Sequence, residues 1–531
     1  MPNQGFEADQ TVAAAKSSCL NKSPEEVFSR GWPFSFRQDF VQDRALLTKT
    51  ALMILMLVFF LDILSRNANA DVDLWGYLAF GRLFWEGGSF PYQDIFTYVP
   101  THTVWVYHEW LTGVLFYPIY AHLGAAGLQS LKMIFAFASL SLIFATARRR
   151  GASFYGAALI LIVMSGFLMG GYSPVRAQVF TYFFFTLTLY LLETARLTCR
   201  WRGLWLFIPI QVAWCNLHGG FLAGLGLIFI YAAGEALARR PFWPYLTILG
   251  LSALATLINP YGLQYWLFMM QAATMPRPEI TEWASILSAY KLGLQAKYLY
   301  YFAAVCIFVG SLIWVCRWRE LTAGLALAIT FCLGLKHIRH QEFFLILSAA
   351  YLAAPLSSYL TVLNNRPRIQ ALRHRLVWHL FLIFFMTIFF LISQRMISQN
   401  PFSLKVPSCT AKDQGSISYP VNAVDFIRSK KLDGRLLTEF NWGEYLLWTL
   451  YPQCLVAVDG RYETVYPDKV MQSYWDFKYA RPGWEKFLQE YPPDMVLLQT
   501  NSKVYPLLQK EPDWREVYTD AGSGLFVRSS N

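Results

Sequence analysis

The chain has 531 residues, of which 55% are hydrophobic, 17% aromatic and only 15% charged. A soluble domain usually carries about 25% charged residues, so this composition excludes one large soluble domain and indicates an integral membrane protein. Basic cytoplasmic loops between membrane spans explain the formal net charge of +11. Nucleic acid is excluded as a partner, because the chain has no basic and aromatic binding platform.

Residues 1–44 are polar and carry charges of both signs. They lack the short apolar stretch and the small-residue cleavage site of a signal peptide. We therefore expect a retained, flexible tail on the cytoplasmic side.

Eleven membrane spans are predicted in a transmembrane domain over residues 45–395, because a crossing helix needs about 20 mostly apolar residues. Basic clusters such as Arg148–Arg150, Arg239–Arg240 and Arg366–Arg375 fall in every second loop. The positive-inside rule then places the N-terminus in the cytoplasm and the C-terminus outside, in the inner (plasma) membrane of a bacterium. The predicted spans are 47–65, 126–147, 152–172, 177–195, 203–217, 219–237, 244–259, 298–316, 321–336, 341–361 and 376–394.

Two segments of the first outer loop, residues 66–125, are predicted to be amphipathic helices on the outer leaflet. They are 75–85, where aromatic residues lie beside Arg82 and Glu86, and 108–124, which is short and carries Glu109 and His122. Segment 108–124 could instead be a span, but the basic cluster at Arg148 would then fall outside.

Residues 396–531 are predicted to form an extracytoplasmic α/β domain, because short apolar strands alternate with helical segments. Helices are expected at 421–432 and 485–491, strands at 435–438, 455–458 and 495–498, and an edge strand at 525–528. A disulfide between Cys409 and Cys454 is left open.

The polar residues that suit chemistry gather on the predicted outer side, whereas the inner loops look like plain Arg-rich linkers. A transporter would keep such residues near the middle of the bilayer. Polar residues gathered at one membrane interface instead suit chemistry on a membrane-anchored substrate. The candidate residues are Asp71, Asp73, His108, Glu109, Lys132, Arg176, Gln178, Asn216, His218, Asn259, Glu282, His337, Arg339 and His340.

Asp71 and Asp73 are the candidate catalytic residues. Carboxylates beside a bilayer are costly unless they are hydrated, paired or bound to a cation. Either could act as general base, or the two could hold a divalent ion such as Mg²⁺ or Mn²⁺. Lys132, Arg176 and the cluster His337–His340 could hold a phosphate.

Simpler roles compete with these functional ones. Lys132 could only extend toward the interface, and Asn216 and Asn259 could only cap helix ends. Glu109 could be an acid favoured by a helix N-terminus. In the C-terminal domain, Asp459 and Arg461 could bind a sugar or acceptor, or could form a turn that maintains the fold.

The motifs of the chain resemble those of membrane proteins in the GT-C glycosyltransferase superfamily, whose members include lipid A aminoarabinose and protein mannosyl transferases. The resemblance covers about residues 45–531. One departure is that the family's Arg-Pro-Gln reads Arg176-Ala-Gln178 here. The motifs are DVDLWGYLAFGRLFWEGGSFPYQDIFTY, VYHEW, RAQ, NLHGGF, NPYG, ITEW, FNWGEYL and VDGRYE.

The resemblance implies a fold of many membrane helices with a catalytic acidic motif in the first outer loop, which maps onto Asp71 and Asp73. It places Lys132 near a lipid phosphate and leaves the metal open. It implies transfer of a sugar from a polyprenyl-phosphate donor to a glycan, lipid or protein acceptor in the cell envelope. Two alternatives are a flippase or transporter of lipid-linked glycans and a non-catalytic assembly factor.

Overall fold

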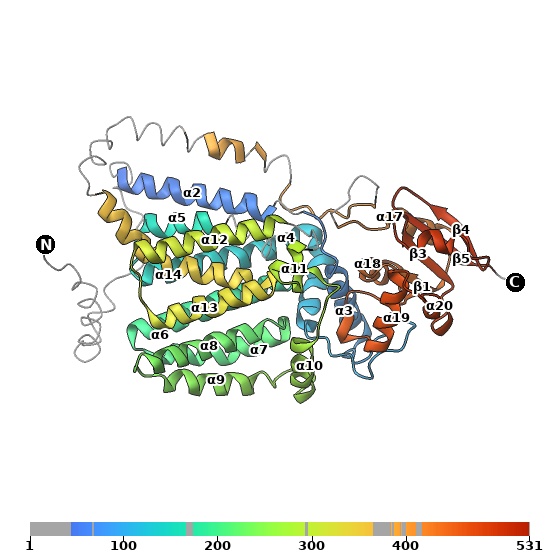
Figure 1. Cartoon of the computed structure of the whole chain (residues 1–531), viewed down its shortest axis with the longest axis horizontal. Helices are drawn as coiled ribbons and strands as arrows, with labels where there is room; N and C mark the ends of the chain where they lie inside the picture. The colour runs from blue at the N-terminus through green and yellow to red at the C-terminus, as the bar shows by residue number, and fades with distance from the viewer. Residues whose placement is uncertain are drawn as a thin grey trace.

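The computed structural model describes residues 44–65, 68–165, 174–291, 296–364, 384, 387–392, 394–395, 400–409 and 417–529. The expected tail lies outside the described residues except for Arg44, and the predicted span 376–394 lies largely outside them. The described chain forms a bundle of helices and a small α/β domain (Figure 1). Shorter helices lie between these two parts and run across the ends of the bundle.

The helices of the bundle coincide with the predicted spans that the structure describes. They are α2 (Arg44–Ser65), α4 (Trp110–Arg149), α5 (Phe154–Ser165), α6 (Gln178–Thr198), α7 (Phe207–Leu217), α8 (Phe221–Leu237), α9 (Trp243–Ala255), α12 (Ala296–Val315), α13 (Leu321–Lys336) and α14 (Gln341–Asn364). Of the described helices, two are long and apolar enough to cross a membrane, Trp110–Arg149 and Ile338–Leu363, and several apolar helices are shorter. The helical architecture is confirmed, and membrane placement stays a prediction.

Helix α4 contains a break that the sequence predicted. Gly124 has φ 60° and ψ −153°, so the backbone leaves helical geometry there, in a conformation that glycine adopts without a Cβ clash. The segment before Gly124 is the predicted amphipathic helix 108–124, and the segment after it is the predicted span 126–147.

Helix α3 (Leu74–Gly87) forms where the sequence predicted a helix, but it is not a surface helix. Its first eight residues, Leu74–Gly81, are buried, and it packs between α4 and α18 (Phe440–Leu450) of the C-terminal domain. A Cβ on Gly81 would collide with the carbonyl of Gly113, and a Cβ on Gly76 would collide with the carboxylate of Glu444. These glycines let α3 approach its neighbours closely, so Trp75, Tyr77 and Phe80 are buried in protein, whereas Trp85 near the end of the helix is exposed.

The end of the bundle opposite the C-terminal domain carries a buried network of ion pairs, so the prediction of plain basic linkers there is wrong. Arg150 pairs with Glu193 at 2.5 Å, and Arg196 pairs with Glu235 at 2.7 Å. Glu320 accepts from both arginines. The network joins α4, α6, α8 and the start of α13, and charges buried with partners in this way resist separation.

The C-terminal domain is built on a five-stranded sheet in the order β2-β1-β3-β5-β4. Strands β1 (Gly434–Thr438), β2 (Cys454–Val456) and β3 (Met495–Gln499) are parallel, whereas β5 (Ser523–Arg528) and β4 (Trp514–Thr519) extend the sheet in antiparallel fashion. The sequence predicted 525–528 as the edge strand, but β4 follows it there, because β4 and β5 pair as a hairpin. Its helices are α17 (Val421–Ser429), α18, α19 (Asp468–Lys478), α20 (Lys486–Glu490) and α21 (Tyr505–Leu508).

Cys409 and Cys454 are both buried free cysteines. The disulfide that the sequence left open is therefore absent between these two described residues.

Arg461 fastens the predicted first outer loop, residues 66–125, to the C-terminal domain. It pairs with Asp94 at 2.5 Å and with Asp459 at 2.7 Å, and its guanidinium lies 4.8 Å from the ring centroid of Trp105. Strand β2 also contacts this loop, because Val456 and Thr97 form a β-bridge between their backbones. The loop that carries the predicted catalytic acids is thus fixed to a separate part of the chain.

We expect Arg461→Met to destabilise the protein, because the substitution leaves the carboxylates of Asp94 and Asp459 buried without their cation. Breaking a buried pair in this way typically costs about 3–5 kcal/mol. Thermal unfolding of the purified protein measures the effect. Arg515→Met is the control, because Arg515 is exposed on β4. Equal midpoints for the two variants would contradict the prediction.

Candidate active site

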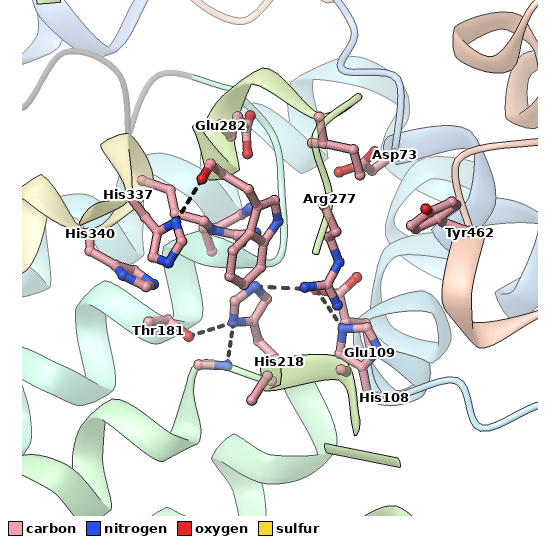
Figure 2. Close-up of a pocket in the computed structure, with 18 of the residues that line it drawn as sticks. Asp73, His108, Glu109, Thr181, His218, Arg277, Glu282, His337, His340 and Tyr462 are labelled. Atoms are coloured by element: carbon pink, nitrogen blue, oxygen red, sulfur yellow. Dashed lines mark hydrogen bonds and ion pairs between the residues drawn. The ribbon is translucent and has the colours of Figure 1, made fainter. Parts of the chain in front are cut away.

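A cavity of about 750 Å³ lies where the helix bundle meets the C-terminal domain. Its walls come from the segments that precede α3 and α4, from the beginnings of α6 and α8, and from α13 and α18. Two short helices, η2 (Thr281–Trp283) and η3 (Ile338–His340), complete them. Figure 2 shows side chains from these distant segments facing one another.

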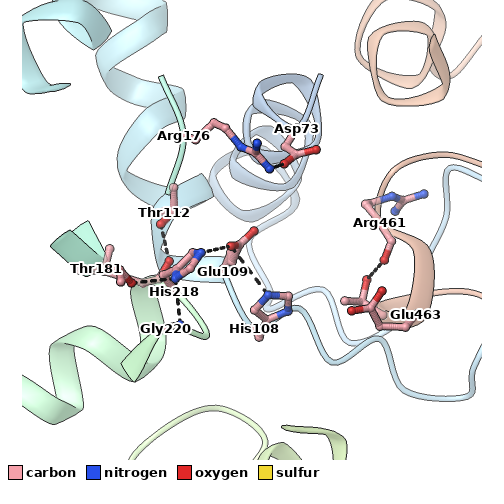
Figure 3. Close-up of polar contacts among 12 residues, drawn as sticks. Asp73, His108, Glu109, Thr112, Arg176, Thr181, His218, Gly220, Arg461 and Glu463 are labelled. Atoms are coloured by element: carbon pink, nitrogen blue, oxygen red, sulfur yellow. Dashed lines mark hydrogen bonds and ion pairs between the residues drawn. The ribbon is translucent and has the colours of Figure 1, made fainter. Parts of the chain in front are cut away.

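The guanidinium of Arg176 contacts carboxylates from two other segments. Its Nε lies 3.2 Å from Oδ1 of Asp71, its Nη1 lies 2.6 Å from Oε1 of Glu282, and its Nη2 pairs with Asp73 (Figure 3). Arg176 is 103 residues from Asp73 and 106 residues from Glu282 in the sequence. One cation therefore joins the segment before α3, the segment before α6, and η2.

Burial and the charge of Arg176 set the protonation of Asp71 and Glu282. Burial raises the pKa of Asp71 to about 7, although Arg176 opposes the change. Burial would also raise the pKa of Glu282, but Arg176 and Arg339 bring it below its usual value. Asp71 is thus poised to change charge near neutral pH, whereas Glu282 stays ionised.

Glu109 lies at the start of α4 and faces the cavity with two histidines beside it. Nε2 of His218 is 3.2 Å from Oε1 of Glu109, and Nε2 of His108 is 3.7 Å from the same oxygen. Burial raises the pKa of Glu109 to about 7, and the charge of Asp73 acts in the same direction. Burial lowers the pKa of His108 to about 4 and that of His218 well below its usual value, so both rings are neutral at pH 7.

A cationic wall faces these acids across the cavity. Arg277 and Arg339 both lie over the indole of Trp283, with 4.5 Å and 4.6 Å from the guanidinium carbon to the ring centroid, and such contacts hold a guanidinium in place. Arg277 also pairs with Glu463 at 2.5 Å. Arg339 makes no ion pair with a carboxylate of the described residues, so its charge is available to a ligand.

The other half of the cavity is apolar. It lies between the bundle helices and is lined by side chains of α6, α8, α13 and α14, namely Phe185, Leu227, Ile230, Ile329, Leu333 and Phe343. A single cavity therefore offers charged groups at the domain junction and hydrocarbon between the helices.

Most of the sequence-predicted site residues meet at this cavity. Asp73, His108, Glu109, Arg176, Gln178, His218, Glu282, His337, Arg339, His340 and Arg461 line it. Asp71 is buried next to it and reaches it through Arg176.

Four further predicted residues, besides Asp71, lie outside the cavity lining. Nζ of Lys132 donates to the carbonyl of Leu64 at 2.8 Å, and the residue is buried in the bundle. Lys132 therefore does not face the cavity where a donor phosphate was expected. The side-chain amide of Asn216 donates a hydrogen bond to the carbonyl of Ile258, and that of Asn259 donates one to the carbonyl of Thr256 in the same turn. Asp459 has no exposed surface and pairs with Arg461, which matches the fold-maintaining alternative.

The sequence did not single out several residues that line the cavity, among them Arg277, Glu444, Thr181 and Tyr77. Arg277 stands between two prolines in a predicted outer loop, and this was the signal that could have marked it. Glu444 belongs to the FNWGEYL motif and accepts a hydrogen bond of 2.9 Å from the backbone of Gly76 on α3. Thr181 and Tyr77 lie in apolar helical stretches that look like ordinary core.

Arg176 contacts one carboxylate oxygen of Asp71 and one of Asp73, so the acid pair is engaged by a guanidinium in this arrangement. Within the described part of the chain, no group of three or more His, Cys, Asp or Glu side chains is arranged to hold a metal ion.

No protein-family model matches this chain, and no curated protein matches it. The similarity to the GT-C superfamily rests on the sequence motifs alone.

We expect Arg176→Gln to destabilise the protein more at pH 8 than at pH 5. The pKa of Asp71 is near 4 in the unfolded chain and about 7 in the folded protein. Between about pH 4 and pH 7, Asp71 therefore carries a proton only in the folded state, and the stability of the protein falls as the pH rises through this range. Loss of Arg176 raises that pKa further and widens the window, and we expect a loss of about 3 kcal/mol at pH 8.

Thermal midpoints measured from pH 4 to pH 8 test this expectation. The control is Arg202→Gln, because Arg202 is exposed at the opposite end of the bundle. A difference between Arg176→Gln and wild type that does not change with pH would contradict it.

Proposed function

We propose that this protein is a membrane-embedded glycosyltransferase of the GT-C type. It would transfer a sugar from a polyprenyl-phosphate donor to an acceptor on the outer face of the membrane. The observation that carries the proposal is the composition of the cavity, in which acids and cations at the domain junction adjoin an apolar space between helices.

The two halves of the cavity suit the two parts of an amphiphilic donor. The apolar residues of α6, α8, α13 and α14 offer a place for the isoprenoid chain. Arg339 would hold the phosphate, because Trp283 orients its guanidinium and no carboxylate of the described residues forms an ion pair with it. Arginine presents paired donors that match phosphate oxygens.

The transfer needs a nucleophile, a leaving group and a proton acceptor. An acceptor hydroxyl oxygen forms a bond to the anomeric carbon, and the bond between that carbon and the phosphate oxygen breaks. The polyprenyl phosphate leaves with the electron pair, and the hydroxyl proton passes to a carboxylate of the cavity. A cation beside the leaving oxygen stabilises the charge that develops there.

The orientation of the proposal follows from the basic clusters. The cavity lies at the end of the bundle opposite Arg150 and Arg196, and the positive-inside rule assigns the basic end to the cytoplasm. The C-terminal domain and the cavity would then face the extracytoplasmic space, where polyprenyl-phosphate sugars serve as donors because they carry their own leaving group.

Labelling of cysteines in intact cells tests this orientation. Cys199 is an exposed cysteine beside Arg200 and Arg202, and we expect a membrane-impermeant maleimide to label it only after permeabilisation. A cysteine introduced by Lys510→Cys on the exposed surface of the C-terminal domain is expected to react in intact cells. The reverse pattern would exclude an outer active site.

We expect Arg339→Gln to lower kcat/KM for transfer by about 10²-fold or more, because donors of this kind typically contribute 10²–10³. The assay follows release of polyprenyl phosphate from polyprenyl-phosphate hexoses of gluco, manno and galacto configuration, each with an envelope-glycan extract as acceptor. Arg319→Gln is the control, because Arg319 is exposed before α13, at its other end.

The result also separates the rival functions. A transporter would move labelled lipid across vesicles and release no polyprenyl phosphate. An assembly factor would neither move nor cleave the lipid. Either result with the wild-type protein would overturn the proposed transfer.

A further inference from the structure

Hydrogen bonds around His218 define which of its ring nitrogens carries the proton. Trp214 donates its indole N–H to Oγ1 of Thr181 at 2.8 Å, and that hydroxyl oxygen lies 2.7 Å from Nδ1 of His218. The backbone N–H of Gly220 donates to the same Nδ1 at 2.8 Å. Because Nδ1 accepts from Gly220, it carries no hydrogen, and Thr181 donates its hydroxyl hydrogen to it.

The neutral ring of His218 therefore carries its hydrogen on Nε2. That nitrogen lies 3.2 Å from Oε1 of Glu109, so the ring contacts the carboxylate (Figure 3). Thr181 and Gly220 hold the imidazole at Nδ1, and only 7% of the residue is exposed. A ring held in this way fixes the position of the carboxylate that it contacts.

The carboxylate of Glu109 differs from those of Asp71 and Asp73 in its partners. Arg176 pairs with both aspartates, whereas no arginine or lysine of the described residues forms an ion pair with Glu109. Asp71 does not line the cavity, and Asp73 lines it with the guanidinium of Arg176 against its carboxylate. Glu109 lines the cavity with no guanidinium paired to its carboxylate, so no such cation competes with an acceptor hydroxyl for its oxygens.

We propose that Glu109 is the carboxylate that accepts the proton of the acceptor hydroxyl, and that His218 is a positioning residue for it. This assignment rests on the proposed transferase function. As the hydroxyl oxygen bonds to the anomeric carbon, its hydrogen moves to a carboxylate oxygen of Glu109, and the phosphate leaves with the electron pair of the broken bond. His218 keeps its own proton on Nε2 throughout.

The charges around Glu109 set the pH at which it works. Tyr77 of α3, His108 of the preceding loop and His218 of the α7–α8 turn adjoin it, and Asp73, Arg176 and Arg339 act on it from the segments before α3 and α6 and from η3. Burial is the largest influence and raises its pKa to about 7. A base is most effective when its pKa lies near the working pH, so the rate is expected to rise with pH through this value.

The experiment compares kcat against pH for the full-length protein in nanodiscs, with the polyprenyl-phosphate hexoses named above. We expect Glu109→Gln to lower kcat by 10²–10⁴-fold and to remove the rise near pH 7, while binding of polyprenyl monophosphate is kept. His218→Leu is expected to lower kcat about tenfold and to shift the rise. His218→Gln, whose amide can still donate, is expected to restore part of the rate.

Two exposed residues outside the cavity supply matched controls, Glu490→Gln and His122→Leu. The assignment of Glu109 would be overturned if the wild-type protein transfers the sugar and Glu109→Gln does so at a near-normal rate. It would also be overturned if Asp73→Asn, and not Glu109→Gln, loses the rise of kcat near pH 7. In both cases the proposed transferase function would stand. A wild-type protein that neither binds polyprenyl monophosphate nor releases it from any hexose donor would overturn both.

Discussion

The arrangement of the cavity depends on the contact of Arg176 with the carboxylates of Asp71, Asp73 and Glu282. These residues come from three parts of the chain, and without the cation the acids would repel one another in a buried place. The pair of aspartates before α3 thus gains a structural role. It holds Arg176 of the segment before α6, and that guanidinium in turn pairs with Glu282 of the helix η2, so the three segments border the same space.

The sequence was sufficient to predict the main architecture and much of the cavity lining. Apolar stretches gave the helices of the bundle, and Gly124 separated the amphipathic part of α4 from its longer part. The unusual polar residues at predicted outer turns, such as Glu109, His218 and Arg339, do lie around one cavity. Their local motifs were visible because polar groups are rare next to apolar spans.

The sequence pattern could not predict which side chains of distant segments pair with one another. Lys132 looked like a phosphate ligand by its depth in a helix, but helix rotation turns it toward the carbonyl of Leu64. Asp459 looked like a ligand contact at the end of a strand, but Arg461 and Tyr466 enclose its carboxylate. The burial of α3 followed from close approach at Gly76 and Gly81, which depends on the partner surfaces and not on the period of the helix.

The ion pairs at the basic end of the bundle bear on how the polypeptide enters a bilayer. In the proposed topology, α6 and α8 each bring a glutamate, Glu193 and Glu235, whose arginine partners lie partly on other helices. A helix inserted singly would expose such a carboxylate to lipid or headgroups at a cost in free energy. In that topology, neighbouring hairpins would associate during biogenesis before these helices reach their final depth, so that assembly of this end would be concerted and not stepwise.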